Sequence, residues 1–161
     1  MAPKLWLLPL ALGVASVGGY AIYASHGDKS AQQPQAKLAL TIQSANGQHR
    51  FAVERAVTEA EQQKGLMYRT DLPDDGGMLF WPYPPSGPAR VASFWMKNTP
   101  SPLDIIFIRA DGTIAHIAEN AVPFSEDPVS SGEPVAAVLE IKGGRATALG
   151  IAEGDKVSWP R

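Results

Sequence analysis

The pattern of apolar and polar residues divides the chain into three parts. After Lys4, the segment LWLLPLALGVASVGGYAIYA, residues 5–24, carries no charge and is long enough to cross a bilayer as a helix. Residues 25–36 are polar and show no apolar period, which is typical of a flexible linker. Short alternating runs begin at Lys37, so we expect a folded domain over 37–161.

Alternating runs in this domain predict a mostly β fold. KLALTIQ alternates, and Asn46-Gly47 is a strong signal for a two-residue hairpin turn before the next strand. Further strands are expected in GGMLFW, in ASFWMKN, in a hairpin turning at Asp111-Gly112, in EPVAAVLEIKGG and in GDKVSW. The predicted fold class is therefore mostly β or α+β, with a compact curled or barrel-like sheet.

One or two short helices should accompany the sheet. Thr58 and Glu61 have the spacing of a capping box, which predicts a helix running to about Gly65. RATALG predicts a second helical turn that ends at Gly150. Between the strands, WPYPPSGP at residues 81–88 should be a surface loop, because proline lacks the amide donor that a strand needs.

The apolar N-terminal segment predicts where the domain resides. We favour an uncleaved signal anchor over a cleaved signal peptide in residues 1–24, because the apolar run exceeds the roughly 7–15 residues usual in signal peptides. With Lys4 on the cytoplasmic side, the positive-inside rule places the domain outside the cytoplasm. We expect a periplasmic domain, exported or anchored to the inner membrane, with the membrane as a partner.

Composition narrows the function classes. The 161-residue chain has a formal net charge of -2, so we expect no binding to nucleic acid. It contains no cysteine, which excludes disulfides, thiolate catalysis and cysteine zinc sites. Walker A, GxGxxG, HExxH, GxSxG and EF-hand motifs are missing as well, and we expect no cofactor and no resident metal.

The largely apolar run ASFWMKNTPSPLDIIFI at residues 92–108 contains polar residues that call for an explanation. They are Lys97, Asn98 and Asp104. In an extended chain Lys97 and Asn98 would face opposite sides, and Asp104 would share the face of buried neighbours. A buried carboxylate needs a cation or backbone amides, and other candidates to complete such a group are Arg69, Arg145 and Glu140.

Several segments of the domain resemble a known family. GLMYRTDLPDDGGMLF at 65–80, FWMKNTPSPLDIIFI at 94–108, VLEIKGG, and GIAEGDKV at 150–157 are similar to domain of unknown function 192 (DUF192). The resemblance spans nearly all of 37–161. It implies a small exported or membrane-tethered β-rich domain, and it implies no particular chemistry.

Two interpretations of the polar residues stay open. One is a buried ion-pair and turn-capping network, in which Asn98 and Asp104 satisfy the backbone of the NTPSP connection at residues 98–102; the other is a pocket for a small polar or anionic ligand. The candidate ligand-binding residues are Arg69, Lys97, Asn98, Asp104 and Glu140. We predict a tethered ligand-binding or envelope accessory module. The alternative is a hydrolase or lyase in which Asp104 or Glu140 acts as the general base and Lys97 or Arg69 stabilises negative charge.

Methionine and aromatic side chains raise two further hypotheses. Thioethers outside the cytoplasm can bind Cu(I), although methionine also fills irregular cores; the residues concerned are Met67, Met78, Met96 and His116. Trp81, Tyr83 and Trp95 would either present an aromatic platform to envelope glycans or a partner protein, or pack the proline-rich loop onto the sheet.

Overall fold

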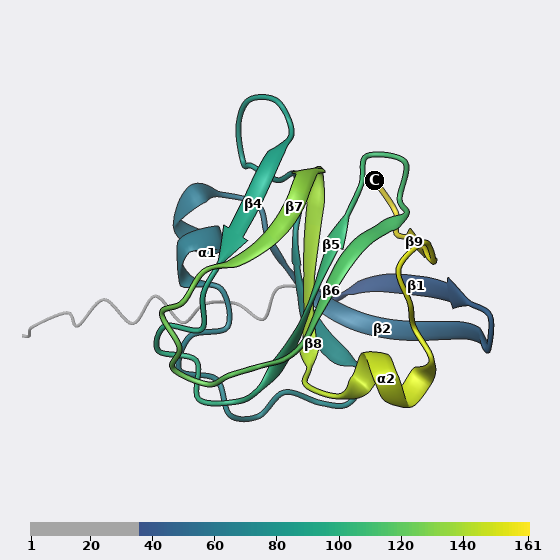
Figure 1. Cartoon of the computed structure of the whole chain (residues 1–161), viewed down its shortest axis with the longest axis horizontal. Coiled ribbons are helices and arrows are strands. Elements are labelled where there is room, and N and C mark those ends of the chain that lie inside the picture. Colours follow the sequence, from purple (N-terminus) through teal and green to yellow (C-terminus); the bar gives the residue numbers. More distant parts are fainter. Residues whose placement is uncertain (1–35) are drawn as a thin grey trace, which may run out of the picture. The chain divides into compact units, whose positions relative to one another are not determined.

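The structure is a computed structural model that describes residues 36–161 (Figure 1). The predicted signal anchor or signal peptide over 1–24 and nearly all of the predicted linker over 25–36 lie outside the described residues. In the part of the chain that is described, no helix is both long enough and apolar enough to span a membrane.

The described domain consists of short strands and two short helices. The strands are β1 (Leu38–Ser44), β2 (Gly47–Ala56), β3 (Gly76–Phe80), β4 (Arg90–Phe94), β5 (Leu103–Ile108), β6 (Ile114–Ala121), β7 (Val129–Val135), β8 (Ala137–Lys142) and β9 (Lys156–Ser158). The helices are α1 (Glu59–Lys64) and α2 (Arg145–Leu149).

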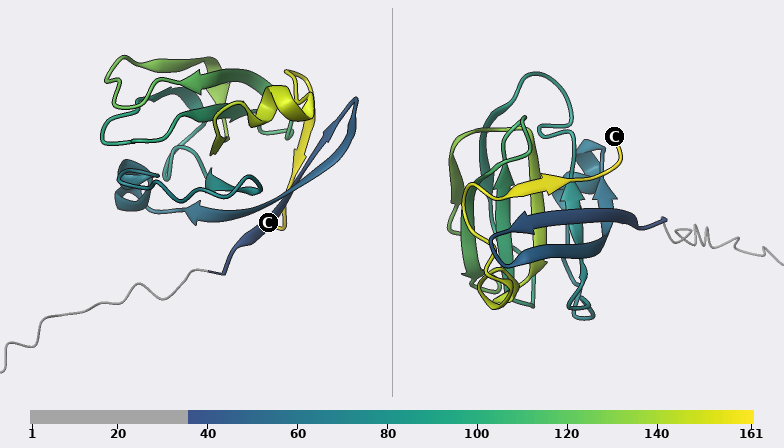
Figure 2. Two further views of the ribbon diagram at one scale, coloured as in Figure 1. Left: turned by 90° about the horizontal axis from the view of Figure 1, so that it is seen from below. Right: turned by 90° about the vertical axis from the view of Figure 1, so that its right-hand side faces the viewer.

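Most of the strands belong to one curled sheet. Seven of them follow the order β6-β5-β8-β3-β2-β1-β9, and β4 pairs with β7 in a separate two-stranded sheet. Figure 2 shows how the large sheet wraps around. The two edge strands of this sheet, β6 and β9, come together at their ends: Thr113 forms a β-bridge with Lys156, and the Ile114 amide donates to the Asp155 carbonyl at 2.9 Å. The predicted fold class, a mostly β curled sheet with two short helices, is confirmed.

Local signals in the sequence set several of these elements. The β1–β2 hairpin forms, but Ser44 pairs with Gly47, so the turn residues lie one position earlier than predicted. Helix α1 begins with the predicted capping box: the Glu61 amide donates to the Thr58 hydroxyl, and the Thr58 amide donates to the Glu61 carboxylate. Helix α2 ends at Gly150, which adopts the left-handed conformation at φ 65°.

Two predicted strands differ from the structure. EPVAAVLEIKGG is divided at Ala136, whose amide donates to the Ile108 carbonyl, so β7 leaves the large sheet and pairs with β4 while β8 stays in its centre. The extended path predicted through Lys97 and Asn98 is wrong as well. A turn forms there, with the Thr99 amide donating to the Met96 carbonyl at 3.0 Å and Asn98 at φ 54°.

The central strands of the large sheet bury both of their faces. On β8, Leu139 and Ile141 pack into one hydrophobic core. Residues of β1, β2 and α2 contribute to the same core. Val138 points to the opposite face, where a second core includes residues of β3, β4, β5 and β7. Because side chains alternate along a strand, Glu140 falls on the face of this second core. The candidate functional site lies around Glu140 on this face.

Candidate functional site

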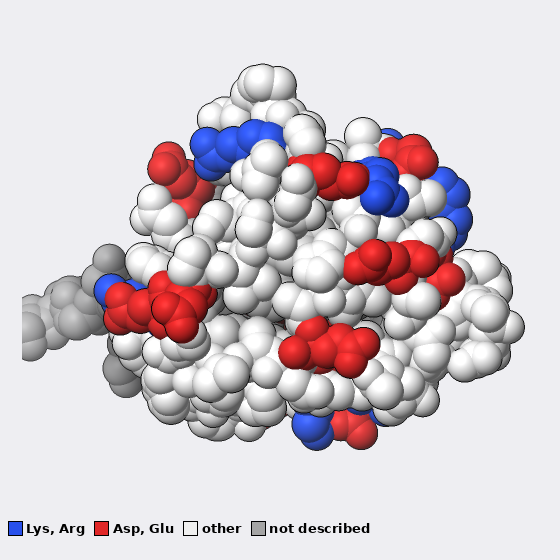
Figure 3. All heavy atoms as spheres, viewed as in Figure 1, with Lys and Arg blue, Asp and Glu red and all other residues white. Residues whose placement is uncertain are grey.

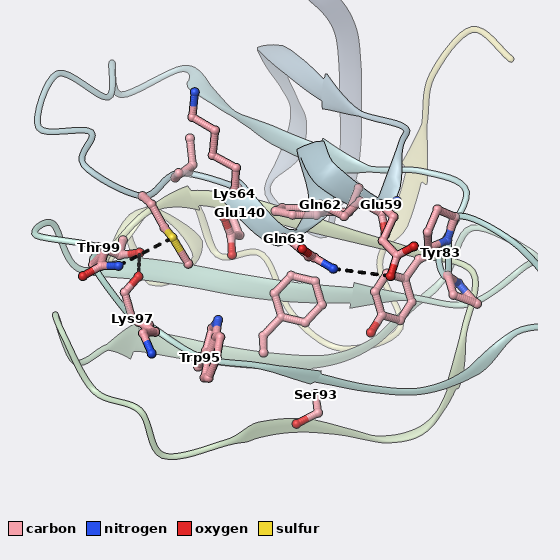
Figure 4. A pocket seen from close by; sticks show the side chains of 18 of the residues that line it. Glu59, Gln62, Gln63, Lys64, Tyr83, Ser93, Trp95, Lys97, Thr99 and Glu140 are labelled. Atoms are coloured by element: carbon pink, nitrogen blue, oxygen red, sulfur yellow. Dashed lines mark hydrogen bonds between the residues drawn. The ribbon is translucent and has the colours of Figure 1, made fainter.

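A pocket of about 780 Å³ opens on the side of the second core (Figure 4). Helix α1 and the residues after it form one side, and the proline-rich loop at residues 81–88 borders one end. Strand β4 and the turn at Trp95–Thr99 form the other side. Aromatic side chains make much of its wall: Phe80, Tyr83, Phe94 and Trp95. Phe94 lies edge-on to Phe80 at 5.0 Å between ring centroids and 5.5 Å from Tyr83, so these rings are continuous.

Glu140 lines the pocket from β8, an interior strand of the large sheet. It stands opposite Met78 on β3 and Ile105 on β5, so apolar neighbours flank it on both sides. The residue is only 5% exposed, and in the described domain no hydrogen bond or neighbouring charge adds to the effect of burial on its pKa. Burial without compensation disfavours the charged form and raises the pKa of Glu140 to about 8. Most Glu140 carboxyls therefore hold a proton at pH 7.

Lys97 and Asn98 reach the same pocket from the turn after β4. Lys97 is half-buried; its ammonium lies 5.0 Å from the centre of the Trp95 ring and 3.7 Å from a carboxylate oxygen of Glu126. The Asn98 carbonyl accepts from the Tyr68 amide at 2.8 Å, which ties the turn to the segment after α1. The Asn98 side chain approaches the Met67 sulfur at 3.9 Å, as a dashed line in Figure 4 marks.

Asp104 lies elsewhere, on the opposite face of the sheet from Glu140. It is fully buried, and its two carboxylate oxygens accept hydrogen bonds from the backbone amides of Asn120, Gly144 and Ala146 at 2.8–2.9 Å. Two of these amides belong to the start of α2, whose first amides have no partner within the helix. Asp104 thus joins β5, β6 and α2 through backbone amides, and none of these hydrogen bonds reaches the connection at residues 98–102 that the sequence predicted it to cap.

Arg69 also stays outside the residues that line the pocket. Its guanidinium contacts Glu54 at 3.1 Å and Asp71 at 2.9 Å. The hydrogen bond to Asp71 and, after it, that to Glu54 raise the pKa of Arg69, while partial burial opposes them. The structure therefore brings together three of the five predicted site residues, namely Lys97, Asn98 and Glu140, and places Arg69 and Asp104 apart from them.

The pocket also contains residues that sequence reasoning missed. Phe80 and Phe94 end β3 and β4, and in the sequence they look like any apolar residue of a core strand. Lys64 and Arg90 contribute cations to the rim. Both flank elements that the sequence does predict, the capped helix and the proline-rich loop, but no local pattern shows that these two elements face one another across a cavity.

The aromatic and methionine residues singled out in the sequence do not all lie at the pocket. Tyr83 and Trp95 line the pocket, whereas Trp81 packs edge-on against Trp159 at 5.9 Å on the other core. Met67 lines the pocket, while Met78 and Met96 are buried among apolar side chains as space-filling residues. His116 on β6 stacks on Phe107 and contacts Glu153 at 2.8 Å. These different surroundings within the described domain give the copper hypothesis no support.

Charges around the pocket favour negative ligands over positive ones. The lining includes the basic residues Lys64, Arg90 and Lys97 and the acidic residue Glu59, besides Glu140. On the face that Figure 3 shows, acidic and basic side chains of the described surface lie next to one another in small groups and form no broad basic area.

Comparisons with known proteins place the chain in a family without a described chemistry. The DUF192 family model, described as an uncharacterized ACR, matches residues 41–159. A protein of unknown function from Novosphingobium aromaticivorans DSM 12444 is 50% identical, with a TM-score of 0.71, over 75% of this chain and 84% of that one. A "putative transcription regulator" from Sinorhizobium meliloti 1021 is 45% identical, with a TM-score of 0.71, over 77% of this chain and 94% of that one. No curated protein matches the chain.

Proposed function

The chain belongs to the DUF192 family, and we propose that its domain binds a small polar or anionic ligand in the pocket beside Glu140. The observation that carries this proposal is the Glu140 carboxyl, which is buried, lacks a protein partner in the described domain and lines an open pocket. An apolar residue at this place would avoid the cost of an unpaired buried polar group. A ligand group that hydrogen-bonds to Glu140 would supply the partner that the carboxyl lacks.

Lys97 and Asn98 belong to the proposed binding site with Glu140, because both residues line the same pocket. We assign no ligand contact to Arg69 or Asp104. The full chain is proposed to hold this domain outside the cytoplasm, through the uncharged segment over 5–24 and the polar linker over 25–36. A binding domain on such a tether would meet its ligand near the membrane surface.

The proposal can be tested with methionine-methyl NMR of the full chain in detergent, because the Met67 side chain lines the pocket and reports on its contents. We would add a panel of small carboxylic acids, sugars and amines. At least one class should shift the Met67 signal in the wild type and in Glu153→Leu, which removes an exposed acid outside the pocket. Glu140→Leu should abolish the shift. A panel that leaves Met67 unmoved, or equal binding by Glu140→Leu, would refute the pocket's role.

A second candidate function is favoured by one observation, namely that a carboxyl of raised pKa faces an open cavity. In an enzyme, Glu140 would then hold a proton at neutral pH and act as a general acid, rather than as the general base predicted from the sequence. Compounds that bind should be incubated with wild type and Glu140→Gln and followed by proton NMR. If the wild type converts a compound and Glu140→Gln does not, the protein is an enzyme. If the spectra of all compounds stay unchanged with both proteins, the enzyme proposal is refuted and the binding proposal stands.

A further inference from the structure

Resting on this proposed function, we propose that the ligand is a small carboxylate with an apolar body, whose carboxylate accepts a hydrogen bond from the Glu140 carboxyl. The two groups then share one proton. This inference names the chemical class that the pocket selects, and it rests on the wall, the rim and the base of the pocket taken together.

The pocket wall fits an apolar body. Phe80, Phe94 and Tyr83 form a continuous series of rings, and Trp95 adds a half-exposed indole on the same side as Lys97. A flat or aliphatic ligand can exchange water for contact with these rings, which is the main source of affinity in small-molecule pockets. Purely polar ligands would leave this wall unused.

The groups that face Glu140 favour an anion. Strands β3 and β5 present the uncharged Met78 and Ile105 to it. The charged groups around the pocket come from other elements: α1 supplies Glu59 and Lys64, β4 supplies Arg90, and the turn after β4 supplies Lys97, which Glu126 approaches. Glu59 accepts a hydrogen bond from Gln63 at 3.3 Å. Three cations against one lining acid, with Glu140 neutral, give a positive surrounding field.

A cationic ligand fits less well, although aromatic rings and a carboxyl can together hold an ammonium group. The ring face of Trp95 is already occupied by the Lys97 ammonium at 5.0 Å. A ligand cation would also approach the rim lysines and Arg90 with the same sign of charge. These contacts oppose an amine and attract a carboxylate.

Proton balance makes the inference testable. At pH 7 Glu140 already carries the proton that the shared O–H···O hydrogen bond requires, so binding a carboxylate anion neither releases nor takes up a proton. Charge-assisted bonds of this kind are among the stronger hydrogen bonds. Because the pKa of Glu140 is about 8, the protonated fraction falls about tenfold between pH 7 and pH 9. The affinity for a carboxylate should fall by the same factor.

We would measure the dissociation constants of phenylacetate, 2-phenylethanol and 2-phenylethylamine for the full chain, following the Met67 methyl signal at pH 7 and pH 9. The three probes share one apolar body and differ in the polar group. Phenylacetate should bind most tightly at pH 7 and about tenfold more weakly at pH 9. Glu140→Gln should bind phenylacetate more weakly than the wild type at pH 7, because an amide is a weaker donor than a carboxyl, and its affinity should not fall between pH 7 and pH 9, because the amide does not ionise. Glu153→Gln is the matched control and should behave as wild type.

Each other outcome counts against a defined part of the reasoning. Preference for 2-phenylethylamine, or tighter binding at pH 9, overturns the carboxylate inference but leaves the pocket as a binding site. Preference for 2-phenylethanol without pH dependence does the same. Equal pH dependence in wild type and Glu140→Gln also overturns it, since the proton would then belong to another group. If none of the probes moves Met67 and the wider panel also fails, the proposed function falls with the inference.

Discussion

Replacing Glu140 with glutamine should make the folded protein more stable at alkaline pH, and the gain should grow as the pH rises. The wild-type carboxyl sits on β8 between apolar neighbours of β3 and β5, and the described domain offers it no partner. Its pKa is raised by burial from 4.5 to about 8. Glutamine has nearly the same shape and cannot ionise, so the comparison isolates the cost of the charge.

The sign and size of the effect follow from proton linkage. Between pH 4.5 and about 8 the folded state binds the Glu140 proton while the unfolded state releases it, so the free energy of unfolding falls as the pH rises. Each pH unit in that window costs about 1.4 kcal/mol. The wild type should therefore lose about 4 kcal/mol between pH 5 and pH 9 through this group alone, and Glu140→Gln should lose none of it. This is a large share of the roughly 5–15 kcal/mol that stabilises an ordinary domain.

Urea unfolding of the full-length wild type and of Glu140→Gln at pH 5, 7 and 9, followed by tryptophan fluorescence, measures this difference. Other carboxyls change their ionisation too: hydrogen bonds from Arg69 and Lys142 lower the pKa values of Asp71 and Asp74, for example. Those groups are identical in the two proteins, so their effects cancel in the difference. If the stability difference between wild type and variant stays constant from pH 5 to pH 9, Glu140 does not titrate as a buried, unpaired carboxyl and the reasoning is wrong.

Two further substitutions test the framework around the pocket. Asp104→Asn should lower the free energy of unfolding by about 3 kcal/mol, because an amide cannot accept from all three backbone donors. The affinity for phenylacetate, measured at a temperature where the variant is folded, should not change. Altered affinity with unaltered stability would contradict the placement of Asp104 outside the pocket. Gly77→Ala should cost about 3 kcal/mol or prevent folding, because its Cβ would lie 2.4 Å from the Glu140 carbonyl oxygen. Gly132→Ala is the control: Gly132 has a φ of 72° and no atom within 4 Å of the added Cβ, so this variant should lose only about 1 kcal/mol in the same urea titration. If Gly77→Ala and Gly132→Ala lose equal stability, the close approach of β3 to β8 does not cause the loss at Gly77.

Much of the fold follows from local patterns that the sequence displays. The capping box of Thr58 and Glu61, the stop of α2 at Gly150 and the strand alternation of β1 and β2 depend on neighbouring residues, and these predictions agree with the structure. The separation of β7 from β8 at Ala136 could not be predicted in this way. It depends on hydrogen bonds to distant partners, since the Ala136 amide donates to Ile108 and its carbonyl accepts from Tyr83.

The candidate site was predictable only in part, for a related reason. The polar residues in the run over 92–108 are unusual enough to be singled out, but which of them share a cavity depends on the turn at Met96–Thr99. That turn brings both Lys97 and Asn98 to the pocket, although an extended chain would point them to opposite sides. Lys64 and Arg90 reach the rim from elements distant in sequence, which no pattern in the sequence brings together.

Asp104 and Glu140 show how far sequence reasoning reaches and where structure must decide. Both are acidic residues in apolar strands that pair with each other, Asp104 standing opposite Ile141 and Glu140 opposite Ile105, so the two carboxyls emerge on opposite faces of the sheet. On one face, the start of α2 supplies backbone amides and satisfies Asp104 inside the protein. On the other, the described chain supplies no donor, and an open pocket stands in its place. A carboxyl that the fold compensates is explained by stability alone. One that the fold leaves uncompensated beside a cavity calls for a partner from outside the protein, and that difference supports the binding role that we propose for Glu140.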